Sequence, residues 1–321
     1  MTKFEYSIVI PVYKNSANIP SLIQRAAEIE KGFSKQRILV EFIFVVDGCP
    51  EGSYEILKTE FSKNHFSSKL YKLNRNVGSA QAIKFGLKEA DGEYVAVMAA
   101  DLQEPADLFV DMYLAIKESG DEIVFASRKK RNDGFINNSY SAAYWKLWSM
   151  ALKKKIPSGG MDVFCMTQEA KKRFVENSYK GSALIAALLD LNLPYSFVPY
   201  ERINRGEGKS AWTFKKKLRM VSDSVYGFTD LPLRLINYIG VGGIFISIIL
   251  GSTVVVGKLL GIIDSPGFAA LITTILFTNS LLIIAISIAT NYIWRIFLNS
   301  KGDNLFFSID EFKKGYDNEK S

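Results

Sequence analysis

The sequence predicts an α/β domain with a mostly parallel sheet, followed by an amphipathic interface helix and two transmembrane helices. Short apolar runs alternate with helical patterns through the first half of the chain, which is typical of βαβ units. Several of these runs end directly in acidic or amide residues. Two long uncharged stretches near the C-terminal end predict the membrane part.

Five strands and three helices are expected in the sheet domain. The expected strands are residues 4–12, 39–46 and 70–73, a central strand that begins at Tyr94, and residues 122–126. The expected helices are residues 18–31, 78–90 and 107–119. Alternation of this kind implies right-handed crossovers, so the strands should run parallel with their carboxyl ends along one edge. Ligands of open α/β sheets bind at that edge.

The central strand is the one around which the domain is organised. From Tyr94 it runs through apolar residues into Asp101 and Gln103, and Pro105 then ends it. A carboxylate at this position could hold a divalent cation against a diphosphate. It could equally cap the following helix, and the stretch alone leaves both interpretations open.

The composition restricts the chemistry. With one histidine and two cysteines, the chain is not suited to a disulfide framework, a Cys/His zinc site or a Ser-His-Asp triad. Catalysis must therefore use carboxylates, cations and a metal. The net charge of +7 is compatible with nucleic acid, anionic lipid or phosphorylated substrates. No basic segment followed by an apolar run opens the chain, so we expect no cleavable signal peptide.

Residues 213–231 place apolar side chains on one helical face and cations on the other, which is typical of a helix in a membrane interface. Packing on the sheet domain is the alternative. The 23 uncharged residues 235–257 and the 30 uncharged residues 265–294 are each long enough to cross a bilayer. A buried helical hairpin in a soluble protein is the alternative here. We expect a cytoplasmic domain over residues 1–212, a juxtamembrane helix over 213–234, a transmembrane hairpin over 235–294 and a cytoplasmic tail over 295–321.

Charges around the hairpin predict its orientation. Cations flank its outer ends, whereas the connecting loop offers only Lys258. The positive-inside rule then places the sheet domain and both termini in the cytoplasm, at a multi-pass inner-membrane location. Gly243, Ser247 and Gly251 recur every four residues, a small-residue face suited to contact within a homo-oligomer.

Six stretches in fixed order carry a family resemblance. They are residues 7–13 (SIVIPVY), 44–48 (FVVDG), 74–78 (NRNVG), 100–105 (ADLQEP), 198–202 (VPYER) and 205–212 (RGEGKSAW). Together they resemble the family 2 glycosyltransferases of the dolichol-phosphate mannose synthase and polyprenyl-phosphate glycosyltransferase type. The resemblance covers nearly the whole chain.

The resemblance implies a GT-A type fold and a sugar transfer that inverts the anomeric centre. The donor would be a nucleotide sugar, expected to be UDP-linked, and the acceptor an undecaprenyl or dolichyl phosphate. The product would serve cell-envelope glycan biosynthesis. Mg²⁺ or Mn²⁺ is the implied cofactor, the membrane is an implied partner, and no nucleic-acid partner is expected.

Site residues follow from the matching positions. The donor nucleotide would be held by Pro11, Tyr13, Asp47, Gly78, Gln103 and Ser210. The metal would lie on Asp101 and Gln103, and Arg205 would close over the donor diphosphate. The acceptor phosphate would be held by Arg128, with Lys129 and Arg131. Catalytic roles fall to Asp101, Arg128, Arg205 and Asp162, although a turn or capping role explains Asp162 as well.

The chain departs from the family pattern at two places. Ala99 replaces the first aspartate of the usual Asp-x-Asp, so metal binding should depend on Asp101. Lys14, Asn15 and Ser16 stand where an acidic residue is usual. Two other functions stay open: a processive polysaccharide synthase, which would normally carry a Gln-x-x-Arg-Trp element absent here, and a non-catalytic membrane scaffold with a weakened metal site.

Overall fold

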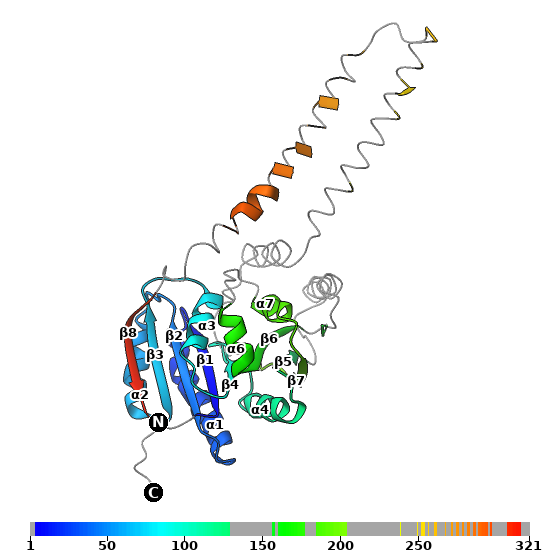
Figure 1. The fold of residues 1–321 in the computed structure, drawn as a ribbon. Helices are drawn as coiled ribbons and strands as arrows, with labels where there is room; N and C mark the ends of the chain where they lie inside the picture. Colours follow the sequence, from blue (N-terminus) through cyan, green and yellow to red (C-terminus); the bar gives the residue numbers. More distant parts are fainter. Residues whose placement is uncertain are drawn as a thin grey trace. The chain divides into compact units, whose positions relative to one another are not determined.

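The computed structural model describes residues 4–128, 156–157, 160–176, 184–203 and 307–315, together with scattered residues between 238 and 296. The chain divides into two compact units (Figure 1). The first unit comprises Met1–Asp223 and Gly302–Ser321, and the second comprises Ser224–Lys301. The first unit contains both the sheet and the residues that concern function.

A mixed sheet of eight described strands forms the centre of the first unit, in the order β7-β5-β6-β4-β1-β2-β3-β8. Their bounds are β1 Tyr6–Val12, β2 Val40–Val46, β3 Ser67–Leu73, β4 Tyr94–Val97, β5 Ile123–Arg128, β6 Met161–Thr167, β7 Tyr195–Tyr200 and β8 Ser308–Lys314. Strands β1 to β5 and β7 run in one direction, whereas β6 and β8 run against it. The predicted GT-A type, mostly parallel α/β sheet is therefore confirmed.

Helices cover both faces of this sheet. The described helices longer than one turn are α1 Ile19–Ser34, α2 Ser53–Lys63, α3 Ser79–Lys88, α4 Asp107–Ser119, α6 Gln168–Glu176 and α7 Leu184–Asp190. Alternate residues of β1 show how the faces are divided, since Ile8 joins the core formed with α1, α2 and α4. Val9 points the other way, toward α3. A Cβ at Gly86 of α3 would lie 2.4 Å from Val9 Cγ1, so glycine allows α3 to pack closely on the sheet.

Strand β8 follows the second unit in the sequence and belongs to the sheet of the first unit. It pairs antiparallel with β3, and Figure 1 shows it at the sheet edge in red. The ring of Phe312 lies 6.5 Å from that of Phe61, and Lys314 Nζ donates a hydrogen bond to the Phe61 carbonyl over 3.1 Å. Residues 295–321 were expected to form a tail, so a strand within them is a finding that the sequence did not predict.

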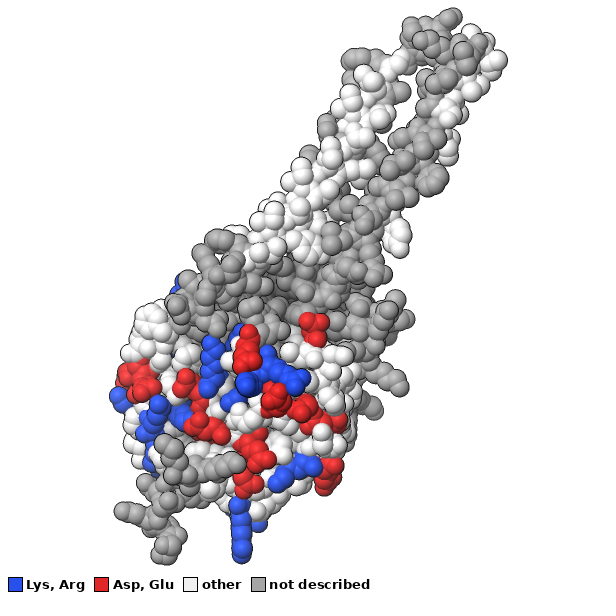
Figure 2. Space-filling model, viewed as in Figure 1, with Lys and Arg blue, Asp and Glu red and all other residues white. Residues whose placement is uncertain are grey.

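The described residues of the second unit carry no charged side chain (Figure 2). Large apolar side chains are exposed among them, including Ile249, Leu260, Leu271, Leu282 and Ile286. Within the part of the chain that the structure describes, no helix combines the length and the apolar character required to cross a bilayer. The predicted interface helix, residues 213–234, lies outside the described residues, as do most residues of the two predicted spans and Gly243, Ser247 and Gly251.

Candidate active site

The candidate site lies where the parallel strands end. Tyr13 follows β1, Asp47 follows β2, Asp101 follows β4, Arg128 ends β5 and Arg202 follows β7. Because these strands share one direction in one sheet, their carboxyl ends lie along the same edge. The structure therefore brings residues from five separate parts of the chain to the edge that the sequence predicts.

Asp47 is buried and bound to backbone. Its Oδ1 accepts a hydrogen bond from the Val77 N–H over 2.7 Å, and its Oδ2 accepts one from the Gly78 N–H over 2.9 Å. Burial raises the pKa of Asp47 above its ordinary value, although these two N–H groups oppose the shift. Gly48 has a φ of +55°, and a Cβ there would lie 2.3 Å from the Arg75 carbonyl carbon. The turn after β2 thus packs directly on the segment before α3.

Asp101, Gln103 and Arg202 form a polar cluster at the end of β4. The Arg202 guanidinium lies 3.7 Å from Asp101 Oδ2 and donates a hydrogen bond to Gln103 Oε1. The Ile203 N–H donates to the Gln103 carbonyl over 2.9 Å. The chain that leaves β7 is therefore tied to the loop after β4 through both backbone and side chain.

The backbone of this loop is itself held in an unusual conformation. Leu102 has a φ of +61°, in the left-handed region that non-glycine residues rarely adopt. Asn15 donates a hydrogen bond from Nδ2 to the Ala100 carbonyl over 3.2 Å. Backbone strain of this kind persists only where surrounding contacts enforce it. Here the hydrogen bonds from Asn15 and Ile203 hold the backbone on either side of Leu102.

Glu104 is a buried carboxyl group beside this cluster, with 2% of its surface exposed. Burial, followed by the negative charge of Asp101, raises the pKa of Glu104 to about 7, while Arg202 and Arg128 oppose the shift. The Arg25 guanidinium of α1 donates a hydrogen bond to the Glu104 backbone carbonyl. A carboxyl group that still holds a proton near neutral pH adds little negative charge to the site.

Arg128 is buried at the end of β5, with 8% of its surface exposed. Its backbone N–H donates to the Gly160 carbonyl over 3.4 Å, which joins the start of β6 to the same edge. Asp162 belongs to β6, but its side chain lies outside the described structure. The remaining predicted residues Lys129, Arg131, Arg205 and Ser210 also lie outside the described residues.

The donor residues predicted on β1 are at this edge as well. Pro11 and Tyr13 are both partly buried, the first within β1 and the second directly after it. The oxygens of Asp101 and Gln103 suit Mg²⁺ or Mn²⁺, since both ions prefer oxygen ligands and both oxygens already face a cation, Arg202. Among the described residues, no group of three or more His, Cys, Asp or Glu is arranged to hold a metal. One carboxylate and one amide would be completed by phosphate oxygens and water.

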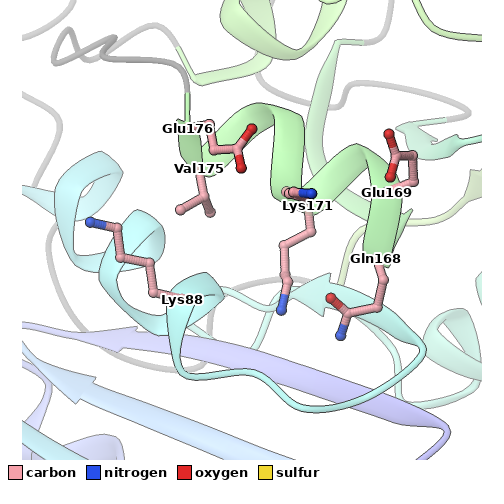
Figure 3. A pocket seen from close by; sticks show the side chains of 7 residues that line it. Lys88, Gln168, Glu169, Lys171, Val175 and Glu176 are labelled. Carbon is pink, nitrogen blue, oxygen red and sulfur yellow. The ribbon is translucent and has the colours of Figure 1, made fainter.

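A depression lies at the opposite end of the strands from the candidate site (Figure 3). It is lined by Lys88, Gln168, Glu169, Lys171, Lys172, Val175 and Glu176. Lys171 Nζ donates to the Ala90 carbonyl over 2.7 Å and Gln168 donates to the Gly92 carbonyl, which places the depression at the amino end of β4. Its lysines are thus remote in the fold from the strand ends that carry Asp47 and Asp101.

The sequence indicated no role for Arg202 or Glu104, although both lie within stretches that carry the family resemblance. Their position at the site depends on two relationships that the sequence does not display. One is the path of the chain after β7, which brings Arg202 and Ile203 into contact with Gln103 in the loop after β4. The other is the burial of Glu104 behind α1, from which Arg25 reaches its carbonyl.

Comparison with known proteins identifies the family of this chain. The family model described as glycosyl transferase family 2 matches residues 7–175. The chain is 28% identical over 295 residues to the putative glycosyltransferase CsbB of Bacillus subtilis, covering 92% of this chain and 88% of that protein. It is 25% identical over 312 residues to the undecaprenyl-phosphate 4-deoxy-4-formamido-L-arabinose transferase of Proteus mirabilis, covering 94% and 92%.

A bactoprenol glucosyl transferase of Shigella phage SfV is 25% identical over 296 residues, covering 92% of this chain and 95% of that protein. Among solved structures, the mannosyltransferase PcManGT of Pyrobaculum calidifontis in complex with GDP-Man and Mn²⁺ gives a TM-score of 0.47 at 14% identity, covering 92% of this chain and 88% of that one. The family match spans β1 to α6 and so includes Asp47, Asp101 and Arg128. The chain is therefore a glycosyltransferase, and it belongs to glycosyl transferase family 2.

Proposed function

We propose that this glycosyltransferase moves a sugar from a nucleotide sugar, UDP-linked in our expectation, to a polyprenyl phosphate and inverts the anomeric centre. The observation that carries the proposal is the meeting of the Asp47 turn, the Asp101–Gln103 pair and the buried Arg128 at one sheet edge. The names of two relatives, an undecaprenyl-phosphate arabinose transferase and a bactoprenol glucosyl transferase, support the acceptor class.

For the donor, the chain offers the turn that carries Asp47 and the side-chain oxygens of Asp101 and Gln103. Each Asp47 oxygen has a further lone pair beyond its bond to Val77 or Gly78, which could accept from a base or ribose. Asp101 and Gln103 would hold a divalent cation, which when bound neutralises charge on the departing diphosphate. Arg205, which lies outside the described residues, would bind the same phosphates through its guanidinium.

On the acceptor side, the nucleophile needs little activation. A phosphate monoester with a second pKa of about 6 is mostly a dianion at neutral pH. Arg128 would hold this phosphate, and its burial at the end of β5 strengthens any such contact because little water screens it. Catalysis would then depend on positioning and on stabilising the leaving group.

A membrane location fits the proposed acceptor. The described side chains of the second unit are uncharged, and many large apolar ones among them are exposed, which is typical of a surface that meets lipid or a partner. The chain leaves the first unit after Asp223 and returns to it at Gly302. We therefore propose that residues 235–294 cross the inner membrane twice, so that the parts of the catalytic unit that precede and follow them in the sequence both lie in the cytoplasm.

The direct test is release of free nucleotide by the purified full chain, measured with and without polyprenyl phosphate across a set of nucleotide sugars. We expect release that requires the polyprenyl phosphate, together with a lipid-linked monosaccharide. Asp101→Asn should abolish both, and so should excess chelator. The matched control is Asp111→Asn, which changes an exposed carboxylate of α4 and should leave turnover unchanged.

The same assay separates the alternatives. A processive synthase would release nucleotide and build polymer without polyprenyl phosphate. A non-catalytic scaffold would release no nucleotide with any donor. Wild-type turnover in chelator, or an active Asp101→Asn protein, would remove the single-carboxylate metal site from the proposal.

A further inference from the structure

Arg202 is held against the two side chains that the proposed function assigns to the metal. Its guanidinium lies 3.7 Å from Asp101 Oδ2 and donates to Gln103 Oε1. Both side chains of the ion pair are about three-quarters buried, at 28% and 24% exposure, so solvent screens the interaction only in part. A positive charge therefore already neutralises the ligands when no divalent cation is bound.

The contact is built into the fold. The Ile203 N–H donates to the Gln103 carbonyl over 2.9 Å, and Gln103 Nε2 approaches the Ile203 carbonyl at 3.5 Å. Strand β7 pairs with β5 through Tyr200, two residues before Arg202. The backbone of Arg202 is thereby fixed beside the loop after β4. A change in its contacts with Asp101 must then come from rotation of its side chain.

We propose that Arg202 competes with the divalent cation for the oxygens of Asp101 and Gln103. This inference rests on the proposed function, since it assumes that these two residues are the metal ligands. A carboxylate oxygen paired with a guanidinium is a poorer metal ligand, because the ion pair must be broken before the metal binds. Arg202 is in this sense a positioning residue that lowers the affinity of the donor-free site for metal.

The same arrangement gives Arg202 a use once the metal is bound. The displaced guanidinium stays anchored at the end of β7, next to the place where the donor diphosphate would meet the cation. Planar guanidinium groups bind phosphate oxygens in a two-pronged manner. Arg202 thus keeps Asp101 neutralised in the empty site and is available to phosphate in the filled one.

The experiment is titration of Mn²⁺ into the full chain without nucleotide, with free Mn²⁺ measured by electron paramagnetic resonance. Arg202→Gln removes the guanidinium and keeps a side chain able to contact Gln103. We expect Arg202→Gln to bind Mn²⁺ roughly three- to tenfold more tightly than the wild type, the size expected for loss of one partly screened ion pair. Arg202→Lys should fall between the two, because a single ammonium cannot reach both oxygens as a planar fork does.

Arg25→Gln is the control for a general change in charge. Arg25 contacts the backbone carbonyl of Glu104 in the same loop and makes its ion pair with Glu28. An equal gain in Mn²⁺ affinity in Arg25→Gln and Arg202→Gln would overturn the proposal, as would an Arg202→Gln protein that binds Mn²⁺ no more tightly than the wild type. Thermal unfolding of each variant verifies that the fold is intact.

Asp101→Asn keeps this test separate from that of the proposed function. If Asp101→Asn abolishes Mn²⁺ binding while Arg202→Gln has no effect, the metal site stands and the competition by Arg202 fails. If Asp101→Asn binds Mn²⁺ as the wild type does, the metal lies elsewhere, and both the metal assignment and the competition are wrong.

Discussion

Asp47 Oδ2 accepts a hydrogen bond from the backbone N–H of Gly78 over 2.9 Å, which links the end of β2 to the start of α3. Gly78 has a φ of +88°, a backbone conformation that suits glycine. The proposed nucleotide-binding carboxylate therefore also holds together the turn that surrounds it. Binding and local stability depend on the same side chain.

Asp47→Asn should weaken both properties. An amide NH₂ group would replace one carboxylate oxygen and face a backbone N–H, leaving a buried donor without an acceptor at about 1–3 kcal/mol. We expect the midpoint of thermal unfolding to fall by several degrees and the affinity for nucleotide to fall with it. Differential scanning fluorimetry with and without UDP measures both, and the exposed Asp111→Asn is the control. Unchanged unfolding in Asp47→Asn would mean that the turn does not need these bonds.

Glu104 should make stability depend on pH. Its pKa is raised to about 7 in the folded chain from an ordinary value of 4.5, so the folded state keeps a proton that the unfolded state releases. The free energy of unfolding should therefore fall as pH rises from about 4.5 to 7, by up to roughly 3 kcal/mol, and then level off. Denaturant unfolding in chelator measures this.

Glu104→Gln should lose that component, because the amide does not titrate. Glu118→Gln, which changes an exposed residue of α4, should keep the wild-type profile. If the difference in unfolding free energy between wild type and Glu104→Gln is constant from pH 5 to pH 8, the raised pKa is wrong.

The two cysteines should react very differently with alkylating reagents. Burial raises the pKa of Cys165 to about 12, and its side chain has no exposed surface, so it should stay unmodified in the folded chain. Cys49 is partly exposed in the turn after Asp47, where its sulfur accepts a contact from the Lys14 N–H at 3.3 Å. We expect one fast-reacting thiol, slowed by bound nucleotide. Mass spectrometry after brief labelling identifies it, and labelling of Cys49 that nucleotide leaves unchanged would argue against a nucleotide at this turn.

Loss of β8 should destabilise the catalytic unit. A chain that stops after residue 306 lacks β8 and exposes the edge of β3, a ready template for unwanted strand pairing. We expect a lower unfolding midpoint and aggregation on size-exclusion chromatography. A chain that stops after residue 315 retains β8 and should behave as the wild type. Equal behaviour of the two truncations would show that the pairing adds nothing to stability.

The parallel part of the sheet was predictable because burial leaves a local signature. Strand β2 is buried along its whole length and is apolar except for Glu41, and helix α4 begins and ends at the predicted residues. Strand β3 begins three residues earlier than expected, since Ser67 and Ser68 are buried although they are polar. The strand propensity of serine gives no sign that these two residues are buried.

Other features depend on contacts between distant parts of the chain. Strand β8 carries Asp310, Glu311 and two lysines, so its sequence resembles a solvated tail, and only its pairing with β3 makes it a strand. Asp101 was predicted from its place at a strand end and from the family resemblance. Its ion pair with Arg202 was not, because it depends on the contact between the segment after β7 and the loop after β4, two segments that lie far apart in the sequence.

The return of the chain to β3 has a consequence for biosynthesis. A ribosome makes β8 only after it has made residues 224–301, so the sheet cannot be finished until that segment has emerged. Until then the β3 edge stays open. An interrupted synthesis would thus leave an incomplete sheet that proteases and chaperones can recognise, whereas the finished chain conceals that edge. The position of β8 thereby makes completion of the catalytic unit depend on translation of everything that precedes it.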